Sequence, residues 1–341
     1  MSLDLIRVLA ALLVFLYHIN MELTVKGSAA AWTSIDAGAN IELGQLGTVL
    51  FFILSGFTSS MSYERIRNER RPWLSYYKKR LLSILPMFYI AYILAFIVLR
   101  LPDRSYDKTL VFTIFGMDGY LEMHGVHTCY LVGEWFTGCI LLIYVLYPLI
   151  HRLLDKWPAV LFALALLLKI SALMIIRKTG QTDNDLLFFL PDFIFGALIY
   201  KYLKKVPAYA GIAGLAVFIV FMCIPMPFSY RISITLSGLS LFIAVQWLCG
   251  LMEQRAAGKP AYTQVKQLFS AIAKYTYAIF LTHHVILSFV LRPAAGSIGF
   301  GSYCKLLLTS LIFTALASVS VYGINEYLKT LFARRKKTAN A

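Results

Sequence analysis

The sequence predicts an all-α integral membrane protein with about ten transmembrane helices, on the basis of composition, apolar segment length and loop charge. Of its 341 residues, 59% are hydrophobic and 14% are charged, with a mean hydropathy of +0.71. About a quarter of the residues of a soluble domain are charged. Because a soluble protein of this length could not cover its surface with so few charges, we expect lipid to solvate its apolar side chains.

Ten apolar segments are long enough to cross a bilayer, which takes about 20 helical residues at about 1.5 Å each. The predicted spans are residues 3–21, 43–63, 81–100, 130–150, 157–176, 186–203, 208–225, 232–251, 273–292 and 304–327. The sixth is short and contains Pro191 and Asp192. The chain is therefore expected to form one transmembrane unit, residues 1–329, followed by a basic cytoplasmic tail, residues 330–341.

The charges of the loops predict the orientation in the membrane. The formal net charge is +15, but the basic residues lie between apolar runs and form no single patch, which argues against nucleic-acid binding. The loops assigned to one side hold 21 Lys and Arg, against 7 on the other. Because cytoplasmic loops carry an excess of Lys and Arg, both termini are expected in the cytoplasm.

The first apolar segment is expected to remain in the protein as a helix, because no small-residue cleavage site follows it. The five cysteines show no CxxC spacing. Three of them lie inside apolar runs, so they are interpreted as packing residues rather than disulfides or metal ligands.

Ionisable residues inside predicted spans are the first functional candidates, because burying charge in a membrane is costly. Six of them are singled out as candidates: Arg7, His18, Glu134, Asp192, His283 and His284. Arg7 and His18 are eleven residues apart, which is about three helical turns, so both side chains project from nearly the same face, roughly 16 Å apart. Imidazole titrates near neutral pH and suits a general base. The alternative is a snorkelling arginine, paired locally with Asp4, and a structural histidine.

A basic loop precedes the third predicted span. Seven of its residues are basic: Arg65, Arg67, Arg70, Arg71, Lys78, Lys79 and Arg80. Positive-inside topology explains such a loop, but arginines there also offer planar donors for the phosphates of a nucleotide-bearing donor. The sequence has no GxxxxGK[ST] or GxGxxG motif, so a P-loop ATPase or dinucleotide enzyme is not supported.

The spacing from Arg7 to His18 resembles the first-helix signature of the acyltransferase-3 family of bacterial membrane acyltransferases. The segment FFILSGF at residues 51–57 resembles the second-helix signature of that family, and YKKRLLSILPMFY at 77–89 resembles its third-helix entrance, with Arg80 in place.

Two further motifs extend the resemblance towards the end of the chain. Trp135, Tyr144 and Pro148 follow a family spacing, and YAIFLTHHVI places His283 on the family's late histidine. The chain departs from the pattern at Ser83, where a second arginine is usual, and at Ile140, where glutamate is common. Ser83 therefore cannot make the contact with donor phosphates that an arginine would make, and Ile140 cannot take the role of the family's glutamate.

The resemblance implies transfer of an acetyl group from cytoplasmic acetyl-CoA to a hydroxyl of an extracytoplasmic or lipid-linked glycan at the cell membrane. Arg7 and Arg80, with the neighbouring Lys79 and Tyr77, are then expected to contact the donor. His18 is expected to act as base or as a transient acyl carrier. Glu134, Asp192 and His283 are expected to orient the acceptor or to tune His18.

Other functions remain open at this point. A proton-coupled transporter or flippase for a polar lipid or sugar would also place histidine and aspartate in the membrane. A succinyl or longer acyl donor and an inactive assembly subunit are further alternatives. No metal is expected, because His124, His127 and Cys129 in the loop 101–129 have no second ligand cluster in the sequence.

Overall fold

A computed structural model describes residues 1–28, 31–102, 106–179, 186–227, 230–294 and 296–339. Its α-helices are α1 (Ser2–Val25), α2 (Leu43–Ile66), α3 (Pro72–Leu99), α4 (Val111–Ile114), α5 (Asp118–Met123), α6 (Glu134–Lys156), α7 (Pro158–Thr179), α8 (Leu186–Tyr202), α9 (Ala208–Cys223), α10 (Tyr230–Ala256), α11 (Pro260–Ala273), α12 (Thr276–Val290) and α13 (Phe300–Ala339). The remaining elements are two 3₁₀ helices, η1 (Ala31–Thr33) and η2 (Lys108–Leu110), and an antiparallel hairpin of β1 (Asp36–Gly38) and β2 (Ile41–Glu42). The predicted all-α membrane fold is confirmed.

Each of the ten predicted spans coincides with a helix. Within the described residues, α1, α2, α3, α6, α7, α10 and α13 are long and apolar enough to cross a membrane, while α9 and α12 are apolar but shorter. The number of spans and the cytoplasmic position of the termini stay predictions. Helix α3 is longer than the predicted span 81–100, because it already begins at Pro72. A proline is favourable at the first helical position, where its missing N–H leaves no donor unsatisfied. The last helix runs past residue 329 without a break.

Helices α2 and α8 pack backbone to backbone in the centre of the bundle. A Cβ atom at Gly56 would overlap the carbonyl oxygen of Phe193, and one at Gly196 would overlap that of Ile53. Small residues at both positions therefore allow the close approach that is typical of helix pairs in membranes.

Replacing Gly56 with alanine is expected to destabilise the fold, because the added methyl group forces α2 away from α8. Overpacking of this kind costs about 1–3 kcal/mol, and thermal unfolding of the detergent-purified protein should show it as a lowered midpoint. Gly250→Ala in α10 is the control, since a Cβ there meets nothing within 4 Å. Equal midpoints for the two variants would show that the α2–α8 contact is not this tight.

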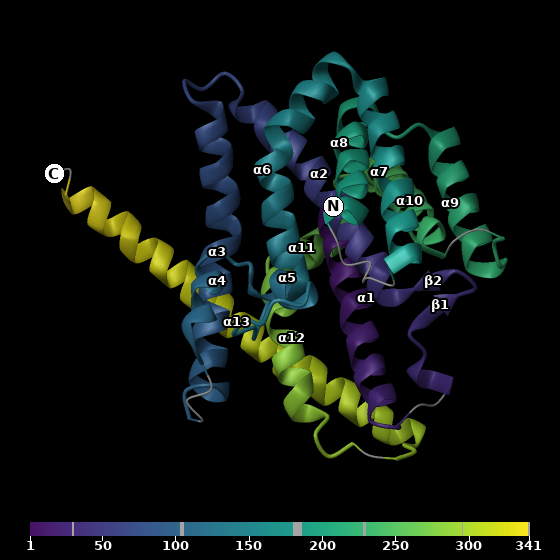
Figure 1. Ribbon diagram of the computed structural model, residues 1–341. Coiled ribbons are helices and arrows are strands. Elements are labelled where there is room, and N and C mark those ends of the chain that lie inside the picture. Colours follow the sequence, from purple (N-terminus) through teal and green to yellow (C-terminus); the bar gives the residue numbers. More distant parts are fainter. Residues whose placement is uncertain (29–30, 103–105, 180–185, 228–229, 295, 340–341) are drawn as a thin grey trace.

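Helix α1 packs against both α2 and α12, and Figure 1 shows it running beside α12. Phe15 and Ile19 of α1 belong to a buried cluster with Leu287 of α12. Near its end, α1 is also fixed to α13, because the Tyr303 hydroxyl donates to Asn20 Oδ1 at 3.0 Å. This packing turns the face of α1 that carries His18 towards α12.

Candidate functional site

Three histidines from two helices meet at the contact of α1 with α12. The ring centroids of His18 and His284 are 4.0 Å apart, those of His18 and His283 5.1 Å, and those of His283 and His284 4.5 Å. His283 is 1% exposed, and the other two are half-buried. Two predicted residues, His18 and His283, are thus brought together, and we call the three rings the histidine cluster.

The orientation of His283 is fixed by its own helix. Its Nδ1 lies 2.8 Å from the carbonyl oxygen of Phe280. A carbonyl only accepts, so Nδ1 carries the proton, and in the neutral ring Nε2 keeps the lone pair. His283 can therefore accept a proton or hydrogen bond only through Nε2.

The histidine cluster also has the ligand types that a transition metal prefers. One nitrogen from each ring can be chosen so that all three lie within 4.8 Å of one another, and among the described residues this is the group of at least three His, Cys, Asp or Glu that gathers in this way. The sequence-based expectation of no metal stays a prediction.

His18 and His284 line a cavity of about 300 Å³, which we call the histidine cavity. Three carboxylates, those of Glu22, Glu42 and Glu122, line it too. Aromatic side chains complete much of its wall: Tyr17, Tyr130, Trp135, Phe136 and Phe280. Its described lining residues include no Lys or Arg, so the cavity offers acceptors for hydroxyl groups and disfavours anions.

Arg7 and Arg80 line a second cavity of about 200 Å³, the arginine cavity. No Asp or Glu is among the described residues that line it. Arg7 is partly neutralised by Asp4, whose Oδ1 lies 3.0 Å from Arg7 Nη1, as the spacing predicts. The two cavities thus carry opposite charge along α1.

The guanidinium group of Arg80 is the least satisfied polar group of the arginine cavity. Its Nε and Nη2 are buried and have no hydrogen-bond partner among the described residues. Its nearest ring neighbours are Tyr144 and Tyr76, at 5.2 and 5.5 Å from the guanidinium carbon. Burying unmatched donors costs free energy, so an anionic ligand that supplies acceptors fits this position.

The two cavities adjoin each other. Phe136 of α6 and Phe280 of α12 line both of them. Their ring centroids are 5.1 Å apart at an interplanar angle of 63°. Sequence reasoning singled out neither phenylalanine, because an aromatic residue in an apolar helix carries no signal of its own.

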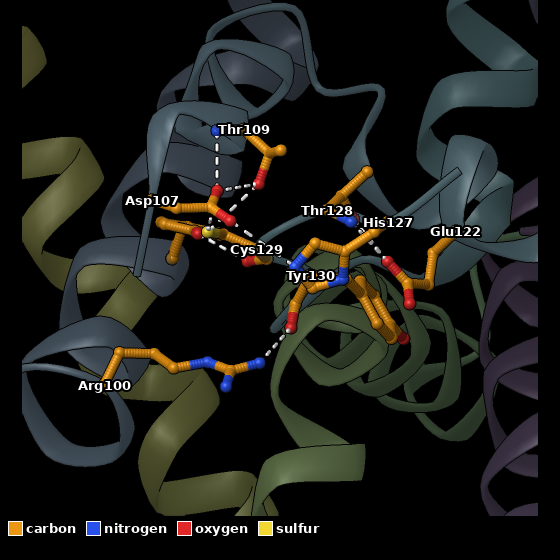
Figure 2. A network of polar contacts seen from close by, with 9 residues as sticks. Arg100, Asp107, Thr109, Glu122, His127, Thr128, Cys129 and Tyr130 are labelled. Atoms are coloured by element: carbon orange, nitrogen blue, oxygen red, sulfur yellow. Dashed lines mark hydrogen bonds and ion pairs between the residues drawn. The ribbon is translucent and has the colours of Figure 1, made fainter. Parts of the chain in front are cut away.

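The loop between α3 and α6 supplies part of the histidine cavity and is held by a polar network (Figure 2). Glu122 accepts hydrogen bonds from Thr128 through N, at 2.7 Å, and Oγ1, at 2.8 Å. Arg100 Nη2 donates to the carbonyl oxygen of Tyr130 at 3.4 Å. Because Glu122 and Tyr130 line the cavity, these bonds fix two of its wall residues.

In a second part of this network, His127 and Cys129 both contact Asp107. His127 Nε2 lies 3.5 Å from Asp107 Oδ2, and Cys129 Sγ donates to Asp107 Oδ1 at 3.7 Å (Figure 2). The amide of Thr109 donates to the same carboxylate at 2.8 Å. Asp107 therefore ties the start of this loop to its end.

Asp118 of the same loop is 1% exposed, and burial raises its pKa to about 7. In the unfolded chain the carboxyl group ionises near 3.8. The folded state therefore holds the proton more tightly, and stability falls as the pH rises from about 4 to about 7. Asp118→Asn is expected to melt higher than the wild type, by a margin that grows between pH 5 and pH 8. A margin independent of pH would contradict this assignment.

Asp192 lies outside the lining of both cavities. Lys169 Nζ of α7 is 3.0 Å from Asp192 Oδ2 and donates to the carbonyl oxygen of Phe188. The same ammonium group lies 3.4 Å from the centre of the Phe188 ring. Asp192 is 0% exposed, so this pair joins α7 to α8 in the interior.

The other predicted residues are placed as follows. The Glu134 side chain lies outside the described part of the structure, although its backbone begins α6. Lys79 is exposed and Tyr77 donates to the carbonyl oxygen of Val145 at 3.1 Å, and neither lines the arginine cavity. Their donor-binding role stays a prediction.

Comparison with known proteins identifies the family of the chain. A family model described as an acyltransferase domain, acyltransferase 3, covers residues 2–324. No curated protein and no solved structure matches the chain. The match includes both cavities and the histidine cluster.

Proposed function

Because the chain belongs to the acyltransferase-3 family, we propose that this multi-pass membrane acyltransferase moves an acetyl group from cytoplasmic acetyl-CoA to a hydroxyl of an extracytoplasmic or lipid-linked glycan. One observation carries the proposal: a cavity with unmatched arginine donors shares a wall with a cavity that contains the histidine cluster. The membrane in question is the cell membrane.

The donor binds in the arginine cavity. Coenzyme A is rich in phosphate, and the unmatched donors of Arg80 offer charge-assisted hydrogen bonds to it. Arg7 lines the same cavity from α1. A cavity of about 200 Å³ holds only part of the donor, so the rest of coenzyme A extends from it into the cytoplasm.

The acceptor hydroxyl binds in the histidine cavity. The other hydroxyl groups of the glycan donate hydrogen bonds to Glu22, Glu42 and Glu122. The sugar ring packs on the apolar faces of Trp135 and Tyr17. Glu42 is oriented by the Tyr230 hydroxyl, which donates to it at 3.0 Å.

His18 takes the proton of the acceptor hydroxyl as its oxygen attacks the thioester carbon. The new C–O ester bond forms, the C–S bond breaks, and the proton passes from His18 to the departing thiolate. The nearby rings of His283 and His284 set the orientation of His18. These steps account for both bonds and for the proton, so the reaction needs no further reactant.

The experiment uses the full-length protein in nanodiscs, with acetyl-CoA and the envelope glycan fraction of cells that lack this protein. We expect free CoA to appear only when both substrates are present, and acetyl ester to appear on the glycan by mass spectrometry. Glycan translocation without CoA release would identify a transporter instead. Release of CoA from a longer acyl-CoA, but not from acetyl-CoA, would overturn the acetyl assignment.

Activity is expected to survive metal removal, because the proposed reaction uses His18 as a base with no metal bound. A metal ion on the nitrogen of His18 that takes the proton would block this step. The measurement compares CoA release before and after dialysis against EDTA, together with the metal content of the purified protein. Activity that is lost on chelation and restored by added Zn²⁺ would make the histidine cluster a metal centre.

A further inference from the structure

We infer that Phe136 and Phe280 form the constriction through which the acyl group reaches the histidine cluster, and that this ring pair limits the donor to short acyl chains. The inference rests on the proposed function, which it makes more specific. It assigns a specificity role to two residues outside the histidine cluster.

The position of the pair follows from the two cavities. Arg80 lines only the arginine cavity and His18 only the histidine cavity, while the two phenylalanines line both. A thioester held near Arg80 must therefore place its acyl group between or beside these rings to meet an acceptor next to His18. Acyl groups that are too thick or long to pass this ring pair cannot do so.

Packing restricts how far the rings can move. Phe280 is 7% exposed, and its ring stacks on Tyr277 with centroids 6.4 Å apart. The Phe136 ring lies 4.9 Å from that of Phe52 and 5.9 Å from that of Phe51. Close-packed rings with aromatic neighbours leave little room, and interiors this dense respond to the volume of even one methylene group.

The constriction also lies next to the histidine cluster. The Phe280 ring is 6.0 Å from the His283 ring, and the Phe280 carbonyl oxygen fixes the Nδ1 proton of His283. Because that hydrogen bond uses the backbone, shortening the Phe280 side chain widens the passage without removing the acceptor that orients His283. The position can therefore be tested by substitution.

The test measures CoA release by the full-length protein in nanodiscs from acetyl-, butyryl- and hexanoyl-CoA, with glycerol as the hydroxyl acceptor. The wild type is expected to prefer acetyl-CoA. Phe280→Ala is expected to raise the ratio of kcat/KM for hexanoyl-CoA to that for acetyl-CoA at least about tenfold, since one methylene that fits or clashes changes specificity by about 10- to 200-fold. Phe280→Leu, which keeps more of the packing, should raise the ratio less.

Phe289→Ala is the matched control, because Phe289 lies on the same helix and outside the lining of both cavities. In this variant, the ratio of kcat/KM for hexanoyl-CoA to that for acetyl-CoA should equal the wild-type ratio. An unchanged ratio in both Phe280 variants, with acetyl-CoA still consumed, would overturn the constriction and leave the proposed function standing. A wild type that consumes none of the three donors with either glycerol or envelope glycan would overturn the proposed function itself.

Discussion

Replacing His18 with alanine is expected to lower kcat for acyl transfer by about 10²- to 10⁴-fold, the usual contribution of a positioned general base. The variant removes an imidazole that lines the histidine cavity and contacts both histidine rings of α12. The KM for acetyl-CoA should change little, because the donor phosphates bind at the other cavity. The measurement is steady-state CoA release in nanodiscs.

His124→Ala is the control for this experiment. His124 is exposed, its Nδ1 lies 2.7 Å from the carbonyl oxygen of Tyr120, and it does not line the cavity. The control should keep wild-type kcat, and both variants should melt within a few degrees of the wild type. Full activity in a folded His18→Ala protein would remove His18 from the reaction.

Replacing Arg80 with alanine is expected to raise the KM for acetyl-CoA by about 10- to 100-fold, because a hydrogen bond to a charged group contributes about 1.5–3 kcal/mol. Without donor, the same variant should be no less stable than the wild type, since it removes buried donors that have no partner. Loss of donor affinity without loss of stability distinguishes a binding arginine from a structural one.

Arg152→Ala provides the matched control, as Arg152 is an exposed residue near the end of α6. It removes the same charge without touching the arginine cavity. Equal KM changes in the two variants would indicate a general effect of charge. A large fall in the melting midpoint of donor-free Arg80→Ala would indicate that Arg80 supports the fold.

The helices could be predicted from the sequence because each span is a long apolar run, and this signal does not depend on packing. The first and last residues of a helix were less predictable where the helix extends beyond its apolar run. Thus α3 begins at Pro72 within the basic loop, and α13 continues into the predicted tail as far as Ala339. Short loop elements, such as the hairpin from Asp36 to Glu42, depend on contacts that the chain order does not reveal, including the Asn40 side chain that donates to the carbonyl oxygen of Phe221.

The site was predictable only in part, because sequence identifies polar groups but not their partners. The spacing of Arg7 and His18 identified two residues that line adjoining cavities. The family motif points to His283 and not to His284, yet the ring of His284 is the closer of the two to His18. The pairing of Asp192 with Lys169 joins residues 23 positions apart, and only the packing of α7 on α8 brings them together.

The most direct test of this account is a cryo-EM structure of the protein with CoA bound. We expect the phosphates of CoA to lie within hydrogen-bond distance of Arg80 Nε or Nη2, with the thiol directed at Phe136 and Phe280 and so towards His18. CoA bound elsewhere, with the donors of Arg80 still unmatched, would contradict the account.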